Sequence, residues 1–65
     1  MTDTERLDFL EKQKIETRWS EIHEQWVLGT YEGNGGFFHW ARNPDLRTAI
    51  DETAREMRGF GNDRN

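Results

Sequence analysis

Residues 26–41 read Trp-Val-Leu-Gly-Thr-Tyr-Glu, then Gly-Asn-Gly-Gly, then Phe-Phe-His-Trp-Ala. The first and third segments are rich in β-branched and aromatic residues, which favour strands, and the glycine-rich segment between them tolerates the positive φ angles of a tight turn. The stretch therefore predicts a β-hairpin. In its extended second strand, Phe38 and Trp40 fall on one face while Phe37 and His39 fall on the other. One face is expected to pack on helices, and the other to be partly aromatic and exposed.

The aromatic residues around this hairpin predict the core. A chain of 65 residues must draw most of its burial from a few large side chains, and aromatic side chains bury the most area. The core residues expected are Trp19, Trp26, Phe38 and Trp40. Tyr31 and Phe37 are expected to be exposed, because a fold this small covers only one face of its sheet. An exposed aromatic face is typical of an interface, so Tyr31 and Phe37 are candidate partner-binding residues.

The segment after the hairpin predicts a helix. Asn43 can cap it, and Pro44 suits the first helical position. Apolar and small residues then recur at helical spacing, at Leu46, Ala49, Ile50, Thr53, Ala54 and Met57. Gly59 followed by Phe60 is typical of a helix stop in which the second residue folds back onto the helix. Residues 61–65 are polar and are expected to fray.

The N-terminal segment predicts a short helix from Asp3 to Gln13, because Thr2 and Glu5 stand at the spacing of a capping box. Leu7 and Leu10 would share one of its faces.

Residues 15–24 allow two interpretations. Ile15, Thr17 and Trp19 alternate as in a strand, whereas an apolar stripe continuing through Ile22 to Trp26 has helical spacing. A strand from Ile15 to Ile22 is favoured, because the leucines of the first helix are out of phase with the later stripe. The alternative is one helix from residue 4 to about residue 27, since no glycine or proline occurs before position 29.

Together these elements predict a single α+β domain over residues 1–60, with residues 61–65 as a frayed tail. Its order is helix, two or three antiparallel strands, helix, with both helices on one face of the sheet. The alternative is a long N-terminal helix, a β-hairpin and a helix. Domains of this size are usually stabilised by disulfides or a structural metal ion, and this chain has no cysteine and only two histidines. We therefore expect a homodimer, formed through the sheet face bearing Phe37 or through an unpaired strand edge.

Several function classes are disfavoured. The N-terminus has no basic region followed by an apolar run, and no segment approaches the roughly 18 apolar residues of a membrane span, so a cytoplasmic location without membrane contact is expected. The net charge of −4 disfavours direct nucleic-acid binding. Glu21, His23, Glu24 and His39 match no metal motif, and residues 33–36 lack the lysine of a P-loop. We expect no enzyme activity and no cofactor or metal.

Three carboxylates crowd the outer face of the last helix, at Asp51, Glu52 and Glu56. Such a group can mimic nucleic-acid phosphates, so the three are candidate partner-binding residues. The favoured interpretation is a solvated helix face on which Glu52 lies near Arg55. In either case the carboxylates are expected to point into solvent and to contribute little to stability.

Two short motifs carry a resemblance. Residues 6–11 read Arg-Leu-Asp-Phe-Leu-Glu, residues 45–51 read Asp-Leu-Arg-Thr-Ala-Ile-Asp, and Trp26-Val27 lies in the strand-rich middle. Together they resemble the paired end motifs of small, mostly uncharacterised phage and prophage accessory proteins. The family brings no activity, cofactor or catalytic residues. The resemblance implies a bacterial cytoplasm and an accessory or host-directed role.

The expected function is therefore that of a non-enzymatic accessory protein that binds a host protein, such as a component of host defence or of nucleic-acid processing. The alternative is a small nucleic-acid-binding module that uses Arg42, Arg47 and the exposed aromatic residues.

Overall fold

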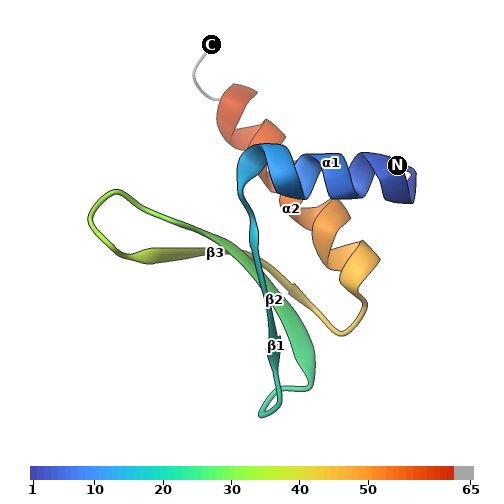
Figure 1. The fold of residues 1–65 in the computed structure, drawn as a ribbon, viewed down its shortest axis with the longest axis vertical. Coiled ribbons are helices and arrows are strands. Elements are labelled where there is room, and N and C mark those ends of the chain that lie inside the picture. The colour runs from blue at the N-terminus through green and yellow to red at the C-terminus, as the bar shows by residue number, and fades with distance from the viewer. Residues whose placement is uncertain (63–65) are drawn as a thin grey trace.

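The computed structural model describes the backbone of residues 1–62 and the side chains of residues 1–59. Its elements are α1 (Asp3–Gln13), β1 (Glu16–Ser20), β2 (Gln25–Tyr31), β3 (Phe37–Asn43) and α2 (Leu46–Asn62) (Figure 1). The strands form one antiparallel sheet in the order β1-β2-β3. The predicted α+β domain is confirmed with three strands, and the alternative of one long N-terminal helix is wrong.

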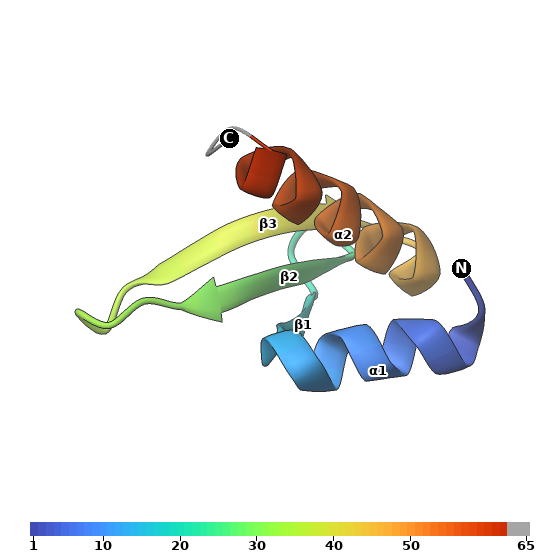
Figure 2. The ribbon, with the colours of Figure 1, turned by 90° about the horizontal axis from the view of Figure 1, so that it is seen from above.

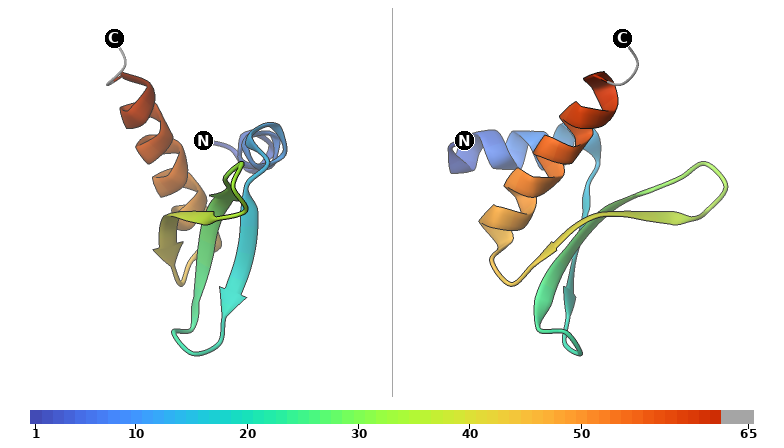
Figure 3. Two further views of the ribbon diagram at one scale, coloured as in Figure 1. Left: turned by 90° about the vertical axis from the view of Figure 1, so that its left-hand side faces the viewer. Right: turned by 180° about the vertical axis from the view of Figure 1, so that it is seen from behind.

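Both helices pack on the sheet face that carries Leu28 of the central strand. Figure 3 shows them side by side at one end of the sheet, with α2 toward β3 and α1 toward β1. The far half of the β2–β3 hairpin extends beyond both helices, as Figures 1 and 2 show. We call residues 30–40 the hairpin arm.

The core is small and aliphatic. Leu28, Ala49 and Ile50 form its buried centre, with Phe9, Leu10, Ile15, Trp26 and Leu46 packed around them. The predicted stripe of α2 is confirmed, since Ala49, Ile50, Thr53 and Ala54 are buried. Three of these four side chains are short, which lets the helix backbone approach the sheet closely. The buried Thr53 hydroxyl donates a hydrogen bond to the Ala49 carbonyl at 2.8 Å, so its polar group is satisfied.

The expectation of an aromatic core is wrong in part. Trp19 is 47% exposed and Phe38 is 38% exposed, while Trp26 and Trp40 are half-buried. Trp19 lies on edge strand β1, and a chain this short buries few of its large side chains completely. These rings pack edge to face on each other instead, with centroids 5.3 Å apart for Trp19 and Trp26 and 4.7 Å apart for Phe38 and Trp40.

Helix α1 begins at the predicted capping box. The Glu5 N–H donates to the Thr2 hydroxyl at 3.1 Å, and the Thr2 N–H donates to the Glu5 carboxylate at 2.7 Å. The helix ends because Lys14 adopts the left-handed conformation, with φ of 54°, and the Ile15 N–H then bonds the Leu10 carbonyl at 3.0 Å. No glycine marks this stop. Leu7 stays 66% exposed, whereas Leu10 packs against the core.

The other element boundaries also differ from the predicted ones. Strand β1 is shorter than expected, and Ile22 lies in the following turn. Asp45, not Asn43, caps α2, because its carboxylate accepts from the Thr48 N–H at 2.9 Å. Asn43 instead holds the preceding turn by accepting from the Asp45 N–H at 2.8 Å. The helix continues through Gly59 to Asn62, so the predicted stop at Gly59 is wrong. The Phe60 side chain and residues 63–65 of the predicted tail lie outside the described residues.

The turn between β2 and β3 is formed as predicted. Gly35 has a φ of 90°, and the Glu32 N–H donates to the Gly36 carbonyl at 2.8 Å. A β-bulge interrupts the pairing of the two strands, since Leu28 pairs with Ala41 while Gly29 pairs with His39. Trp40 is therefore the extra residue of β3. Bulges bend and twist a strand, and here the bulge lies where the hairpin arm leaves the helices.

Leu28→Ala should lower the free energy of unfolding by about 2–5 kcal/mol, because it opens a cavity at the contact of both helices with the sheet. Urea unfolding followed by tryptophan fluorescence measures the change. Ile22→Ala is the matched control, since Ile22 is 89% exposed and its truncation should have almost no effect. Equal losses in the two variants would show that the core lies elsewhere.

Candidate functional site

The sheet face opposite the helices collects cationic and aromatic side chains. Residues paired across antiparallel strands share a face, and residues two apart on one strand share it too. Arg18 and Arg42 therefore flank Val27 on this face, because both pair with it from opposite sides. We call this surface the helix-free face. Its members are Glu16, Arg18, Ser20, Gln25, Val27, Gly29, Tyr31, Phe37, His39 and Arg42.

Phe37 is the centre of a cation–aromatic cluster on this face, formed by Arg18, Tyr31, Phe37 and His39. The Phe37 ring centroid lies 5.1 Å from that of Tyr31 and 5.0 Å from that of His39, both edge to face. The guanidinium carbon of Arg18 lies 4.3 Å from the Phe37 centroid and 5.6 Å from that of Tyr31. Arg18 Nη2 also donates a hydrogen bond to the Tyr31 hydroxyl. The cluster is thus held by cation–π contacts, ring contacts and a hydrogen bond.

Gly29 provides the surface on which the Phe37 ring lies. A methyl group at Gly29 would meet the Phe37 ring carbon Cζ at 2.6 Å, and the carbonyl oxygen of Phe38 closer still. The absence of a side chain therefore leaves room for the ring over Gly29, beside Arg18. Phe37 is half-buried as a result, although no helix covers it. The prediction that Phe37 is exposed is therefore wrong in part, whereas Tyr31 is 59% exposed as predicted.

The cluster remains accessible to a partner. The Arg18 side chain is 47% exposed, and its Nε lies 3.6 Å from a carboxylate oxygen of Glu16, which is 43% exposed. These contacts engage Nε and Nη2, and among the described residues no ion pair or hydrogen bond engages Nη1. Arg42 is exposed and makes neither kind of contact with any residue whose side chain is described. Arg18 and Gly29 were not singled out from the sequence, because their roles depend on the strand register.

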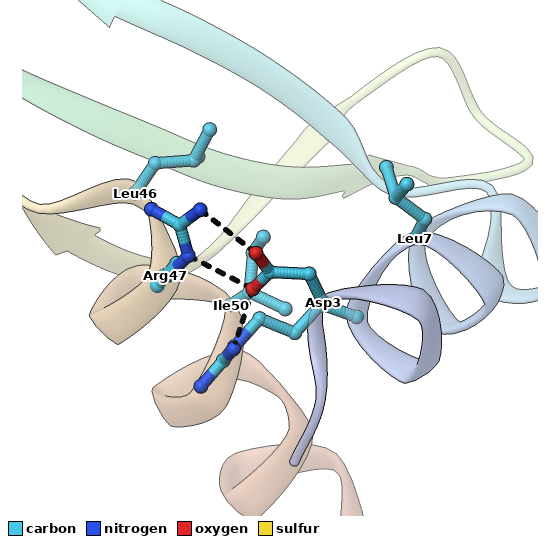
Figure 4. Close-up of a pocket in the computed structure, with 6 residues that line it drawn as sticks. Asp3, Leu7, Leu46, Arg47 and Ile50 are labelled. Carbon is cyan, nitrogen blue, oxygen red and sulfur yellow. Dashed lines mark hydrogen bonds and ion pairs between the residues drawn. The ribbon is translucent and has the colours of Figure 1, made fainter.

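The second candidate region is an ion-pair network between the two helices (Figure 4). Arg6 contacts Asp51 twice at 2.9 Å and Asp3 at 2.8 Å, while Arg47 contacts both carboxylate oxygens of Asp3 at 2.8 Å. The hydrogen bonds from Arg47, with those from Arg6, lower the pKa of Asp3 from 3.8 to about 2. The bonds from Arg6 likewise lower the pKa of Asp51. A pocket of about 230 Å³ lies beside the network, lined by Asp3, Arg6, Leu7, Leu46, Arg47 and Ile50.

This network joins the two segments that carry the sequence resemblance. Arg6 binds Asp51 across the helix contact, and Leu10 and Leu46 pack around the same core. The charges of the network balance once Asp51 is counted, because Asp3 is bound by both arginines and Arg6 also binds Asp51. We call Asp3, Arg6, Arg47 and Asp51 the helix clamp, because their ion pairs join α1 to α2. Each of these charges already has a partner within the fold, so the clamp offers no free charge to a ligand.

The three acidic candidates have different surroundings. The expectation that Asp51 points into solvent is wrong, because both of its carboxylate oxygens accept from Arg6. Glu52 is half-buried and accepts a long hydrogen bond of 3.4 Å from the Asn43 amide. Glu56 is exposed as expected. The α2 carboxylates therefore do not form one freely presented acidic surface.

The remaining polar candidates lie apart. Glu21, His23 and Glu24 are exposed in the β1–β2 turn, whereas His39 belongs to the cluster on the other hairpin. Within the described part of the chain, no group of three or more His, Asp or Glu side chains could hold a metal ion. The two arginines of the nucleic-acid alternative are also separated, since Arg42 lies on the helix-free face and Arg47 on α2 against Asp3.

Comparison with known proteins finds no matching family model, no matching curated protein and no matching solved structure. Among residues 1–62, no helix is long and apolar enough to cross a membrane.

Gly29→Ala should displace the Phe37 ring and lower the free energy of unfolding by about 1–3 kcal/mol, the usual effect of overpacking. Near-ultraviolet circular dichroism should report the loss of the fixed aromatic arrangement, and urea unfolding the loss of stability. Gly33→Ala is the matched control, because a methyl group there would meet nothing within 4 Å. If Gly29→Ala left both signals unchanged, the packing of the Phe37 ring on Gly29 would be wrongly assigned.

Acid should weaken the clamp at Asp3. A carboxylate whose pKa is lower in the folded than in the unfolded chain stabilises the fold above its ordinary pKa of 3.8, and this contribution disappears as the pH falls toward about 2. The difference in urea midpoint between the parent and Asp3→Asn should therefore shrink from pH 6 to pH 2, measured at low ionic strength because salt screens exposed pairs. Thr4→Ala, a change at an exposed and non-titrating position of the same helix, should show no such trend.

Proposed function

We propose that this chain is a non-enzymatic accessory protein that acts by binding another protein through the cation–aromatic cluster of its helix-free face. The observation that carries the proposal is the fixed group of Arg18, Tyr31 and Phe37 on a sheet face that no helix covers. Arginine and aromatic residues dominate the energetics of protein interfaces, and tyrosine combines a large apolar area with a polar tip. Such a group on an uncovered face is typical of a binding hot spot.

The cluster is arranged before any partner arrives. Phe37 lies on Gly29, and Arg18 is held by the two rings and by the Tyr31 hydroxyl. Ordering flexible side chains on binding opposes association, by about 0.5–1.5 kcal/mol for each long side chain. Because the Arg18 side chain is already oriented, much of that loss is avoided. The geometry thus favours binding over a merely solvated surface.

The biological context of the proposal rests on the resemblance to phage and prophage accessory proteins. It points to a bacterial cytoplasm and to a host protein as the partner, with components of defence or nucleic-acid processing as the first candidates. The acidic candidates Glu52 and Glu56 take a secondary place in this proposal, and Asp51 serves the clamp between the helices.

One observation favours the alternative function. Arg42 shares the helix-free face with Tyr31 and Phe37, and aromatic rings beside arginine can stack bases while binding phosphates. Arg47 does not join them, because it is paired with Asp3 on the other side of the fold. Nucleic-acid affinity depends on neutralising many phosphates, and two arginines beside a glutamate supply little of that. Protein binding is therefore the better-supported function.

Tyr31→Ser should abolish capture of the partner from a bacterial lysate, measured by affinity purification and mass spectrometry, while leaving the melting temperature nearly unchanged. The reason is that Tyr31 is exposed yet central to the cluster. Leu7→Ser is the matched control, since Leu7 is a similarly exposed apolar residue on α1. A partner retained by Tyr31→Ser and lost by Leu7→Ser would place the interface on the helices and refute the proposal.

A further inference from the structure

We infer that the partner presents an acidic peptide segment to the helix-free face, with an apolar side chain on Phe37 and carboxylates toward Arg18 and Arg42. The inference rests on the proposed function and deepens it by naming the chemistry of the partner. It follows from the charge of this face compared with the charge of the whole chain.

The helix-free face is locally positive on an acidic protein. Among its members, Arg18 and Arg42 outnumber Glu16, which gives a formal charge of +1 with His39 neutral, whereas the whole chain carries −4. The two arginines stand in one row across the sheet, on either side of Val27. Neighbouring strands lie about 4.8 Å apart, so the two Cα atoms are about 10 Å from each other. Complementary charge on a partner selects and orients it, and here the complement is negative.

The donors of this row suit carboxylates. Arg18 has Nη1 without an ion pair or hydrogen bond among the described residues, and its plane is held by the Phe37 and Tyr31 rings. This Nη1 can donate a charge-assisted hydrogen bond to a carboxylate of the partner. Arg42 is exposed and without such contacts in the same part of the chain. The Phe37 ring lies nearer the hairpin turn than the two arginines and offers an apolar contact. An acidic segment with one apolar residue therefore matches the whole face.

The same charges disfavour the other occupants. A second copy docked face to face by a two-fold axis would bring the Arg18–Val27–Arg42 rows of both copies toward each other, which like charges oppose. A nucleic-acid strand would meet the Glu16 carboxylate beside Arg18 and a protein of net charge −4. An acidic peptide pairs with the row and needs no broad basic surface.

Selection of a displayed library of random 16-residue peptides on the parent protein tests the inference. The recovered peptides should be enriched in Asp and Glu and should carry at least one aromatic or aliphatic residue. A recovered peptide labelled with fluorescein should lose about tenfold or more in affinity toward Arg42→Glu by fluorescence anisotropy. Arg55→Glu is the matched control, because it changes the net charge equally at an exposed position of α2 and should alter the affinity less than about threefold.

Each other outcome decides against the inference in a distinct way. Recovered peptides that need Tyr31 but show no acidic enrichment would refute the acidic partner and leave the proposed function standing. Failure to recover any peptide that needs Tyr31 would count against both. Tighter binding of a 16-residue oligothymidine than of any peptide would identify nucleic acid, and a dimer in sedimentation that Tyr31→Ser dissociates would identify a second copy. Arg42→Gln repeats the affinity test if the melting temperature of Arg42→Glu shows that reversal disturbs the fold.

Discussion

The burial of Leu28 between the central strand and both helices is the interaction on which the rest of the structure depends. Leu28 is fully buried, and residues from α1 and α2 pack around it. A chain of 65 residues can cover only one face of a three-stranded sheet, and only over the length of its two helices. The region around Leu28 is therefore the hydrophobic core, and no helix covers the opposite face of the sheet.

Adjacent residues of β2 serve the two faces. Leu28 faces the helices, and Gly29 faces away and carries the Phe37 ring in place of a side chain of its own. The β-bulge at this point gives β3 its extra residue, Trp40, where the arm leaves the helices. The core and the candidate interface are thus separated by the thickness of one strand. Changes that disturb the packing of this strand should be felt on both faces, whereas changes at Tyr31 or Arg42 concern the outer face alone.

The charged residues divide into two groups with different consequences. Asp3, Arg6, Arg47 and Asp51 satisfy each other between the helices, and their mutual hydrogen bonds lower the pKa of both carboxylates. Arg18 and Arg42 lie on the outer face, where aromatic rings hold Arg18 and the exposed Arg42 makes no ion pair among the described side chains. The clamp charges are held in contacts of 2.8 or 2.9 Å, whereas Arg18 lies 3.6 Å from Glu16 and Arg42 makes no ion pair among the described side chains, so the outer face and not the clamp is the candidate interface.

The sequence by itself determined the first and last helices and the β2–β3 hairpin, because capping residues, turn glycines and periodicity act over a few neighbouring positions. Residues 15–24 stayed open between a strand and a helix, and the tertiary structure decided for strand β1. The capping box at Thr2, the hairpin turn around Gly35 and the buried stripe of α2 followed from such local rules. Tyr31 was correctly expected to be exposed, since only one sheet face can be covered. The tertiary structure alone decided that Trp19 and Phe38 stay exposed, that Arg6 binds Asp51, and that Arg18 meets Phe37. Exposure and long-range contacts of this kind depend on the strand register and on where the helices lie on the sheet. No local pattern in the sequence specifies either of these.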